Sequence, residues 1–484
     1  MASDGEQQLH IFFFPMMAHG HMIPLIDTAR QFAVRGTKCT IITTPINALQ
    51  FSDSIDRGKQ SGLDISIQTI PFPCVEAGLP QGCENANSIH SQEMAQKFFQ
   101  AVGMLRNPLE KLLEELRPDC LVADAFIAWT AEAAGKYGIP RVSFYGNAYF
   151  PLCVMENLQR YAPQEKVTSD SEAFVVPGLP HRIEMTRSKV QLPKRADSGK
   201  TEVQEADAKS FGCIVNSFYE LEPAYADYYN QEIARAWSIG PVSLYNRNAI
   251  DKAQRGKKGS TDEHQCISWL DSKEPNSVLY VSFGSISGIG TAQLHEIALG
   301  LEASGIPFIW VIRKPQNEEI DQCLPDGLEE RMKGKGLIIR DWAPQVLILD
   351  HPAVGGFMTH CGWNSTLEGI CAGIPLITWP MFAEQFINEK LLIEVMKIGL
   401  SVGNEVWNSW RDPKDMGVTK DKIQAVATKL MGNGEEAQDR RRRARELGEM
   451  AKMAVEEGGS SYKNLTVLIE ELREHSKKTL QTKQ

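Results

Sequence analysis

The residues with the clearest chemical potential lie between Trp342 and Gln385, where aromatic, imidazole, amide, hydroxyl and carboxylate side chains follow one another closely. The apolar run 354–358 predicts a buried parallel strand, and the residues from His360 to Glu368 predict a polar loop and a helix start. Such a loop, at the carboxyl end of a strand, is where open α/β sheets bind ligands. The unpaired N–H groups and the dipole of the helix suit a phosphate, and His360 adds a donor. The stretch therefore predicts a phosphate-binding βα unit.

A second group of candidate residues lies near the N-terminus. His19 and His21 share the loop before a predicted helix, and a helix N-terminus disfavours imidazolium, which keeps the ring neutral and able to accept a proton. Asp124 ends the apolar strand 119–124. A carboxylate there could hold the second nitrogen of a histidine, as in hydrolase triads, or it could only cap the following helix.

Two series of strands and helices must position these groups. The first contains strands at 9–15, 39–44, 119–124, 140–145, 212–216 and 237–242, with a helix over 91–116; the second contains strands at 278–283, 307–312, 336–340 and 354–358. Residues 246–265 are polar and rich in Lys, Arg and Gly, as expected of a linker. We therefore predict an α/β protein with an N-terminal domain over 1–245, a linker over 246–265 and a C-terminal domain over 266–461.

Length and composition limit the possible functions. A chain of 484 residues favours two domains, and the net charge of −10 argues against a nucleic-acid surface. The ten cysteines show neither zinc-ligand spacing nor a disulfide framework. No Asp-x-Asp motif occurs near Trp342–Gln385, so the sequence does not indicate a metal ion there. No window of 18 apolar residues indicates a membrane span. We expect a cytoplasmic monomer that binds small molecules and needs no metal ion or other cofactor.

The stretch Trp342–Gln385 resembles the C-terminal signature of the plant UDP-sugar glycosyltransferases, without a gap over its 44 positions. The resemblance covers nearly the whole chain and is also tight over 9–44. It implies the GT-B fold, two Rossmann-like α/β/α domains facing across a cleft, with the final helix over 462–484 packing back on the N-terminal domain. It further implies UDP-glucose as co-substrate, because Gln385 accompanies glucose in the family.

The same resemblance implies roles for individual residues. In the donor site, Trp342 would stack on uracil, and Ala343 and Gln345 would hold the edge of the base. The diphosphate would be held by Ser285, His360, Asn364 and Ser365. Glu368 would bind the ribose, and the sugar would be held by Trp363, Glu384 and Gln385. His21, which precedes Pro24 at the family spacing, would be the catalytic base, with Asp124 as its partner. Apart from the resemblance, we expect the acceptor to meet His19, Tyr145, Tyr149 and Ala383, with an apolar pocket in the first domain between the 71–87 loop and the 145–150 turn, because ligand sites are mostly apolar.

Other interpretations compete with these roles. Ser365 and Glu368 fit a capping box that needs no ligand, and Trp342 and Trp363 could be core residues. An NAD-dependent oxidoreductase would require a G-x-G-x-x-G turn, and a serine hydrolase a G-x-S-x-G elbow, neither of which occurs where expected. We expect an inverting O-glucosyltransferase that moves glucose from UDP-glucose to a phenolic acceptor, either a flavonoid or a coumarin. The alternatives are a triterpenoid or steroid acceptor and a non-catalytic UDP-sugar-binding protein.

Overall fold

The chain forms two compact units in the computed structural model. By their contacts, Met1–Tyr149, Pro193–Asn246 and Met453–Gln484 make up unit 1, and Phe150–Leu192 and Arg247–Lys452 make up unit 2. The structure describes residues 8–192, 200–246, 250, 252, 263–285, 288–313, 323–340, 342–408 and 414–481. Most of the linker predicted at 246–265 lies outside these residues.

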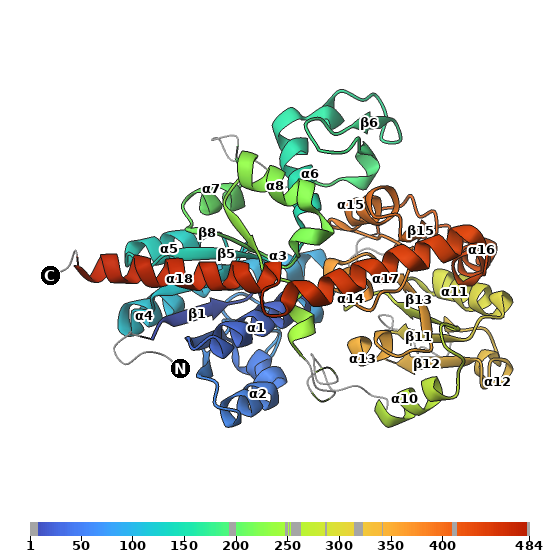
Figure 1. Ribbon diagram of the computed structural model, residues 1–484, viewed down its shortest axis with the longest axis horizontal. Helices are drawn as coiled ribbons and strands as arrows, with labels where there is room; N and C mark the ends of the chain where they lie inside the picture. Colours follow the sequence, from blue (N-terminus) through green and yellow to red (C-terminus); the bar gives the residue numbers. More distant parts are fainter. Residues whose placement is uncertain are drawn as a thin grey trace. The chain divides into compact units, whose positions relative to one another are not determined.

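Unit 1 is built on a parallel sheet with the strand order β3-β2-β1-β4-β5-β8-β9 among the described residues (Figure 1). The strands are β1 (His10–Phe14), β2 (Lys38–Thr43), β3 (Ile65–Thr69), β4 (Cys120–Asp124), β5 (Arg141–Tyr145), β8 (Gly212–Val215) and β9 (Ala236–Ser238). The chain builds outward from β1 in one direction and from β4 in the other, so the sheet has a topological switch point between them. Ligands of open α/β sheets bind at the carboxyl ends of such neighbouring strands.

Helices of unit 1 cover this sheet and explain its apolar strands, which are buried on both faces. They are α1 (His19–Val34), α2 (Pro45–Gln60), α3 (Gln92–Met104), α4 (Arg106–Leu116), α5 (Thr130–Lys136), α7 (Glu202–Ala208), α8 (Pro223–Glu232) and α18 (Ser460–Gln481). The single helix predicted over 91–116 is in fact α3 and α4, which meet at Leu105. Leu465, Leu468 and Leu472 of α18 join the core of unit 1.

Unit 2 contains a second parallel sheet, with the order β12-β11-β10-β13-β14-β15 in the described part of the chain. Its strands are β10 (Val278–Ser282), β11 (Phe308–Ile312), β12 (Gly336–Arg340), β13 (Val354–Thr359), β14 (Leu376–Thr378) and β15 (Gly399–Ser401). Its helices are α6 (Tyr149–Tyr161), whose first residue belongs to unit 1, α10 (Glu263–Asp271), α11 (Thr291–Ser304), α12 (Leu328–Arg331), α13 (Gln345–Leu349), α14 (Trp363–Cys371), α15 (Gln385–Lys390), α16 (Lys420–Met431) and most of α17 (Glu435–Val455). The switch point of this sheet lies between β10 and β13.

The division into units differs from the predicted domain boundaries in residues 150–192 and in residues 453–461, which group with unit 1. Residues 150–192, with the hairpin of β6 (Ala173–Val175) and β7 (Glu184–Thr186), group with unit 2 rather than with the first 245 residues. Lys189 explains part of this grouping, because its ammonium lies 2.6 Å from the Glu405 carboxylate and 6.0 Å from the Phe386 ring centroid. Hydrophobicity patterns show individual strands and helices but not such long-range contacts.

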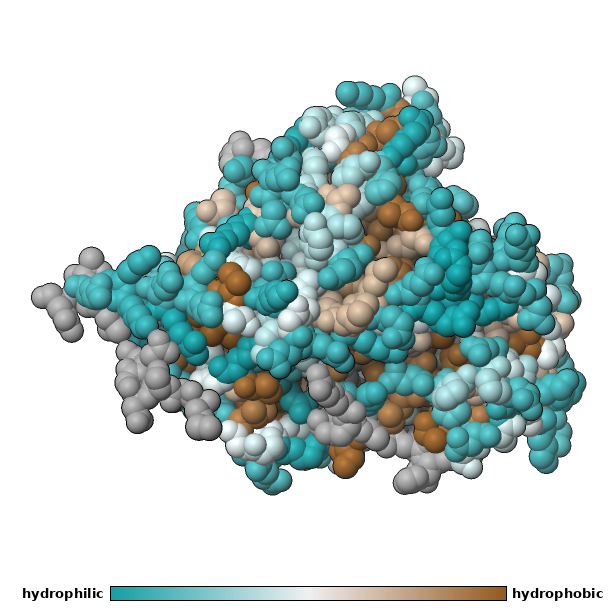
Figure 2. Space-filling model, viewed as in Figure 1, coloured by the Kyte–Doolittle hydropathy of each residue, from teal (hydrophilic) through white to brown (hydrophobic). Residues whose placement is uncertain are grey.

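The hydropathy of the surface and the state of the cysteines can be compared with the expectations from composition. Figure 2 shows hydrophilic residues over most of the visible face, with apolar residues in scattered groups. Among the described residues, no helix is both long and apolar enough to cross a membrane. All ten cysteines are buried and free.

Candidate active site

The switch point of unit 1 brings His21 and Asp124 together. His21 lies in the first turn of α1, directly after β1, and Asp124 is the last residue of β4. His21 Nδ1 is 2.8 Å from Asp124 Oδ2. The carboxylate can only accept, so Nδ1 carries the proton and Nε2 is the basic nitrogen of the neutral ring. The Asp124 side chain is 1% exposed and that of His21 33%, so the pair consists of a buried carboxylate and an accessible imidazole.

Phe126 is a neighbour of this pair that the sequence motif did not single out as a site residue. Its backbone N–H donates to Asp124 Oδ1 at 3.0 Å, which makes the chain bend back after β4. Its ring lies edge-on to His21, with centroids 5.3 Å apart, and is 63% exposed. Its exposure results from this backbone bend, which no local sequence pattern shows, so the sequence analysis missed it.

The sequence analysis predicted that His19 contacts the acceptor in a pocket, but the structure buries this residue. Its side chain is 1% exposed, and its Nδ1 and Nε2 lie 2.7 Å from Asn87 Oδ1 and 2.6 Å from Gln50 Oε1. Nearby, Glu84 Oε2 accepts the backbone N–H of Ile46 at 2.9 Å, in the first turn of α2. These contacts attach the 71–87 loop to the starts of α1 and α2, so His19 helps to position the loop.

The other predicted acceptor residues divide into buried and accessible ones. Tyr149 is fully buried and packs edge-on against Tyr229, so its side chain also departs from the predicted pocket role. Tyr145 is half-buried and donates its hydroxyl to Asp207. Burial and the Asp207 charge raise the pKa of Tyr145 well above its ordinary value, so it stays protonated. Ala383 is exposed in unit 2 and has a left-handed backbone, with φ of 54°.

The switch point of unit 2 carries His360 between two glycines. His360 follows β13, Gly284 follows β10, and Gly362 caps the N-terminus of α14. A Cβ added to either glycine would lie 2.4 Å from a ring atom of His360, so no other residue type fits without displacing the imidazole. Cys361 has φ of 64°, an unfavourable conformation for a side chain of its kind. This tight loop holds the ring beside the first turn of α14.

His360 is neutral over the ordinary pH range. Burial, with a smaller contribution from Arg313, lowers its pKa from 6.5 to about 4. Its buried Nδ1 has no hydrogen-bond partner among the described residues. A neutral imidazole can donate one N–H to an anion but adds no positive charge, so the dipole and backbone N–H groups of α14 are the main electropositive features beside it.

The lowered pKa of His360 predicts acid destabilisation. Between about pH 6.5 and 4 the unfolded histidine binds a proton that the folded one does not, so the free energy of unfolding decreases as pH falls, by roughly 3 kcal/mol at the lower end. His360→Gln should lack this contribution. Urea unfolding of both proteins at about pH 7.5, 6 and 5 measures the difference. Identical pH dependence in the two proteins would show that His360 does not contribute.

Gln345 organises the start of α14, and the capping-box interpretation is wrong. Gly362 is the cap, and Ser365 and Glu368 lie inside the helix. Gln345 Nε2 donates to Ser365 Oγ at 3.0 Å and to Glu368 Oε2 at 2.8 Å, while its Oε1 accepts the Tyr280 hydroxyl at 3.3 Å. The side chain of Gln345 therefore orients two predicted donor-site residues.

The remaining predicted donor residues lie around the same edge of unit 2. Trp342 is half-buried, with the Arg313 guanidinium 5.6 Å from its ring centroid, and Trp363 is 2% exposed at the first position of α14. Gln385 is 3% exposed, and its Oε1 accepts the N–H groups of Met381 at 2.9 Å and Phe382 at 3.1 Å, which leaves its Nε2 to reach a ligand. Ala343 is buried, and Ser285, Asn364 and Glu384 are half-buried. The described residues contain no group of His, Cys, Asp and Glu suited to a metal.

One Rossmann-like unit has a His–Asp pair, and the second has a helix N-terminus beside a half-buried imidazole. These are the parts expected of a nucleotide-sugar-dependent transferase. Residues 248–402 match the family described as UDP-glucoronosyl and UDP-glucosyl transferase. The chain is 52% identical to a scopoletin glucosyltransferase of Nicotiana tabacum, over 97% of this chain and 99% of that protein. It is 51% identical to a UDP-glucose flavonoid 3-O-glucosyltransferase of Fragaria ananassa, over 98% of each.

Solved structures agree with the sequence relatives. A crystal structure of a Glycyrrhiza uralensis UDP-glycosyltransferase, complexed with glycyrrhetinic acid 3-O-monoglucuronide, superposes with a TM-score of 0.91 at 40% identity, over 99% of this chain and 98% of that one. The chain belongs to the UDP-glycosyltransferase family, and the predicted GT-B fold is confirmed. It is an enzyme that uses a UDP-sugar donor and a small-molecule acceptor.

Proposed function

We propose that this enzyme is an inverting O-glucosyltransferase that moves glucose from UDP-glucose to a phenolic hydroxyl of a coumarin or a flavonoid. The observation that carries the proposal is the accessible His21 ring, oriented by buried Asp124 at 2.8 Å and flanked by the exposed Phe126. The names of the relatives, which include a scopoletin and a flavonoid glucosyltransferase, support the choice of donor and acceptor.

In this proposal unit 1 supplies the base. The proton on Nδ1 is held by Asp124, so Nε2 of His21 takes the proton of the acceptor hydroxyl as the oxygen attacks the anomeric carbon. Asp124 stabilises the imidazolium that forms and fixes the tautomer. One displacement inverts the anomeric carbon, so an α-linked donor yields a β-glucoside.

Unit 2 holds the donor. Trp342 stacks on uracil, Ala343 and Gln345 lie at its edge, and Glu368, oriented by Gln345, receives the ribose hydroxyls. Ser285, Asn364, Ser365, one N–H of His360 and the first turn of α14 bind the diphosphate and stabilise it as it leaves. The amide Nε2 of Gln385, together with Glu384 and Trp363, contacts the sugar. Because N–H groups and a helix dipole stabilise the leaving group, we propose that no metal ion takes part.

The acceptor would lie against apolar surface near His21. Phe126 offers an exposed ring, and the ring of half-buried Tyr145 is held in place by the bond from its hydroxyl to Asp207. Flat rings suit a planar phenolic. A triterpenoid acceptor is the second candidate, because the Glycyrrhiza uralensis structure at 40% identity holds glycyrrhetinic acid 3-O-monoglucuronide. A cytoplasmic location and a monomeric state remain predictions from composition.

Incubation with UDP-glucose and scopoletin, with product detection by mass spectrometry, tests this function. We expect a monoglucoside that forms equally well in excess EDTA, has the β configuration by NMR, and forms with a higher kcat/KM than products from UDP-galactose or UDP-glucuronate. A panel with a flavonol and a triterpenoid ranks the acceptors. A strict divalent-cation requirement would contradict the diphosphate site, and equal kcat/KM for the three donors would contradict the role of Gln385.

A further inference from the structure

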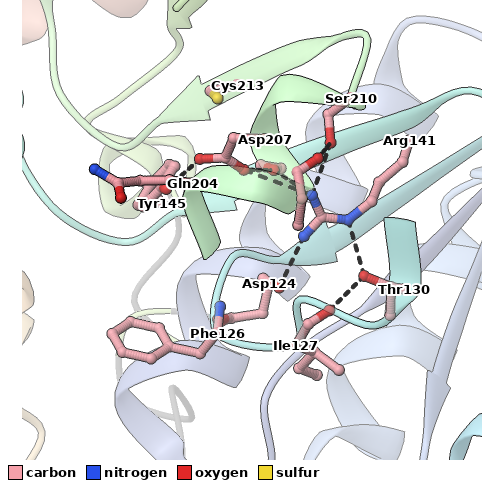
Figure 3. A network of polar contacts seen from close by, with 12 residues as sticks. Asp124, Phe126, Ile127, Thr130, Arg141, Tyr145, Gln204, Asp207, Ser210 and Cys213 are labelled. Atoms are coloured by element: carbon pink, nitrogen blue, oxygen red, sulfur yellow. Dashed lines mark hydrogen bonds and ion pairs between the residues drawn. The ribbon is translucent and has the colours of Figure 1, made fainter. Parts of the chain in front are cut away.

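A polar network around Arg141 in unit 1 reaches the main chain of Asp124 (Figure 3). At its centre is Arg141, the first residue of β5, which is 2% exposed. The Arg141 guanidinium donates from Nε to Thr130 Oγ1 at 2.8 Å and from Nη1 to Ser143 Oγ at 2.5 Å and Ser210 Oγ at 2.8 Å. A buried cation is costly unless it is paired and fully hydrogen-bonded, so this network is a built feature of the fold.

One side of the network fixes the turn that follows β4. Thr130 Oγ1, which accepts from Arg141, donates to the carbonyl oxygen of Ile127 at 2.5 Å. The Ile127 N–H donates to the carbonyl oxygen of Asp124 at 3.0 Å, and Arg141 Nη2 lies 3.5 Å from the same oxygen. Both the main chain of Asp124 and the turn after it are therefore attached to Arg141. The direction of the Asp124 carboxylate follows from that turn, because Phe126 N–H holds its Oδ1.

The other side of the network reaches Tyr145. Asp207 on α7 lies 3.6 Å from Arg141 Nη1 and balances its charge. The Asp207 carboxylate accepts the hydroxyls of Ser143 and Tyr145. The Arg141–Asp207 ion pair thus holds both the turn that follows Asp124 and the ring of Tyr145, which is expected to contact the acceptor.

We propose that the Arg141–Asp207 pair, whose arginine is buried, positions the His21–Asp124 pair, with Arg141 and its relay Thr130 as positioning residues for proton transfer. This inference rests on the proposed role of His21 as the base. Loss of the relay lets the 124–127 turn move, which turns the Asp124 carboxylate away from His21 Nδ1. The base then loses the fixed tautomer and the stabilisation of its imidazolium, although every group that contacts a substrate is still present.

Thr130→Val is the central test, because it removes the hydroxyl relay without changing any charge. We expect kcat to fall about 10- to 100-fold, with the KM for UDP-glucose unchanged, because a small misplacement near the reacting groups has effects of this size. Arg141→Lys keeps the positive charge but lacks the planar guanidinium with its several N–H donors, so it should lower kcat by a similar factor. Thr130→Ser keeps the hydroxyl and should restore activity. Thr37→Val removes an equally buried hydroxyl beside Cys39, away from the network, and should leave kcat unchanged.

Acceptor acidity separates positioning from general destabilisation. With 7-hydroxycoumarin and its more acidic 6,8-difluoro derivative as acceptors, the loss caused by Thr130→Val should be larger for the less acidic coumarin, as for His21→Ala. In the His21→Ala background Thr130→Val should cost nothing further. An equal loss with both coumarins, or additive losses in the double mutant, would overturn the positioning role. Full activity of His21→Ala would instead overturn the proposed base, so the two failures are distinguishable.

Discussion

Replacing His21 with alanine is expected to lower kcat by roughly 10²- to 10⁴-fold, the usual contribution of a positioned general base. UDP affinity should not change, because the residues proposed to hold UDP belong to unit 2. Asp124→Asn should lower kcat less, since Asp124 acts only through the His21 ring, and the double mutant should resemble His21→Ala. Steady-state kinetics and calorimetric titration of UDP into each variant measure both effects.

His19→Ala is the comparison for this experiment. His19 bonds to Asn87 and Gln50 through its two ring nitrogens, so its loss should lower stability more than kcat. If His19→Ala lost the rate and His21→Ala kept it, the assignment of the base would be wrong. If neither changed kcat, the enzyme would use no histidine base in unit 1. Acidic phenols will reduce the effect of His21→Ala, because their hydroxyls ionise without help.

His360→Ala should lower kcat/KM by roughly 10²- to 10³-fold, as expected for the loss of one donor to a departing oxyanion. Because burial keeps His360 neutral, its contribution is a directed N–H and not a charge, and His360→Gln, which retains an N–H donor, should recover part of the activity. His351→Ala is the matched control, since His351 lies in the same unit but bonds to Asp271. The measurement is kcat/KM for UDP-glucose at a saturating acceptor concentration.

Full activity of His360→Ala would contradict the proposed diphosphate site. Activity of His360→Gln no better than that of His360→Ala would show that the shape of the imidazole, enclosed by Gly284 and Gly362, matters more than its N–H. Either result can be read from the same three variants.

The parallel sheets could be predicted from the sequence because their strands are short apolar runs ending in polar loops. The loops that hold His21 and His360 follow from the same pattern, since the ends of parallel strands meet at one edge of a sheet. The family spacing to Pro24 favoured His21 over His19 as the base, which stays a prediction; in the structure the His21 side chain is 33% exposed and His19 is buried.

What could not be predicted depends on contacts between distant segments. Ser365 and Glu368 have the spacing of a capping box, yet Gln345, 20 residues before Ser365, bonds to both. Nothing in the composition of β5 shows that Arg141 points inward with its charge balanced by Asp207, which lies on a separate helix. Phe126 is exposed although it follows an apolar strand, because its backbone bends back to Asp124. Local patterns contain no information on such partners.

The two backbone N–H groups bound by Gln385 bear on how donor preference can diverge among related enzymes. Its oxygen accepts the N–H groups of the turn at Met381 and Phe382, while its nitrogen is the atom proposed to contact the sugar. A replacement at this position must therefore satisfy the turn as well as the sugar. A side chain that cannot accept both N–H groups would leave them unpaired, so a substitution that changes donor preference at this position also alters the turn at Met381 and Phe382.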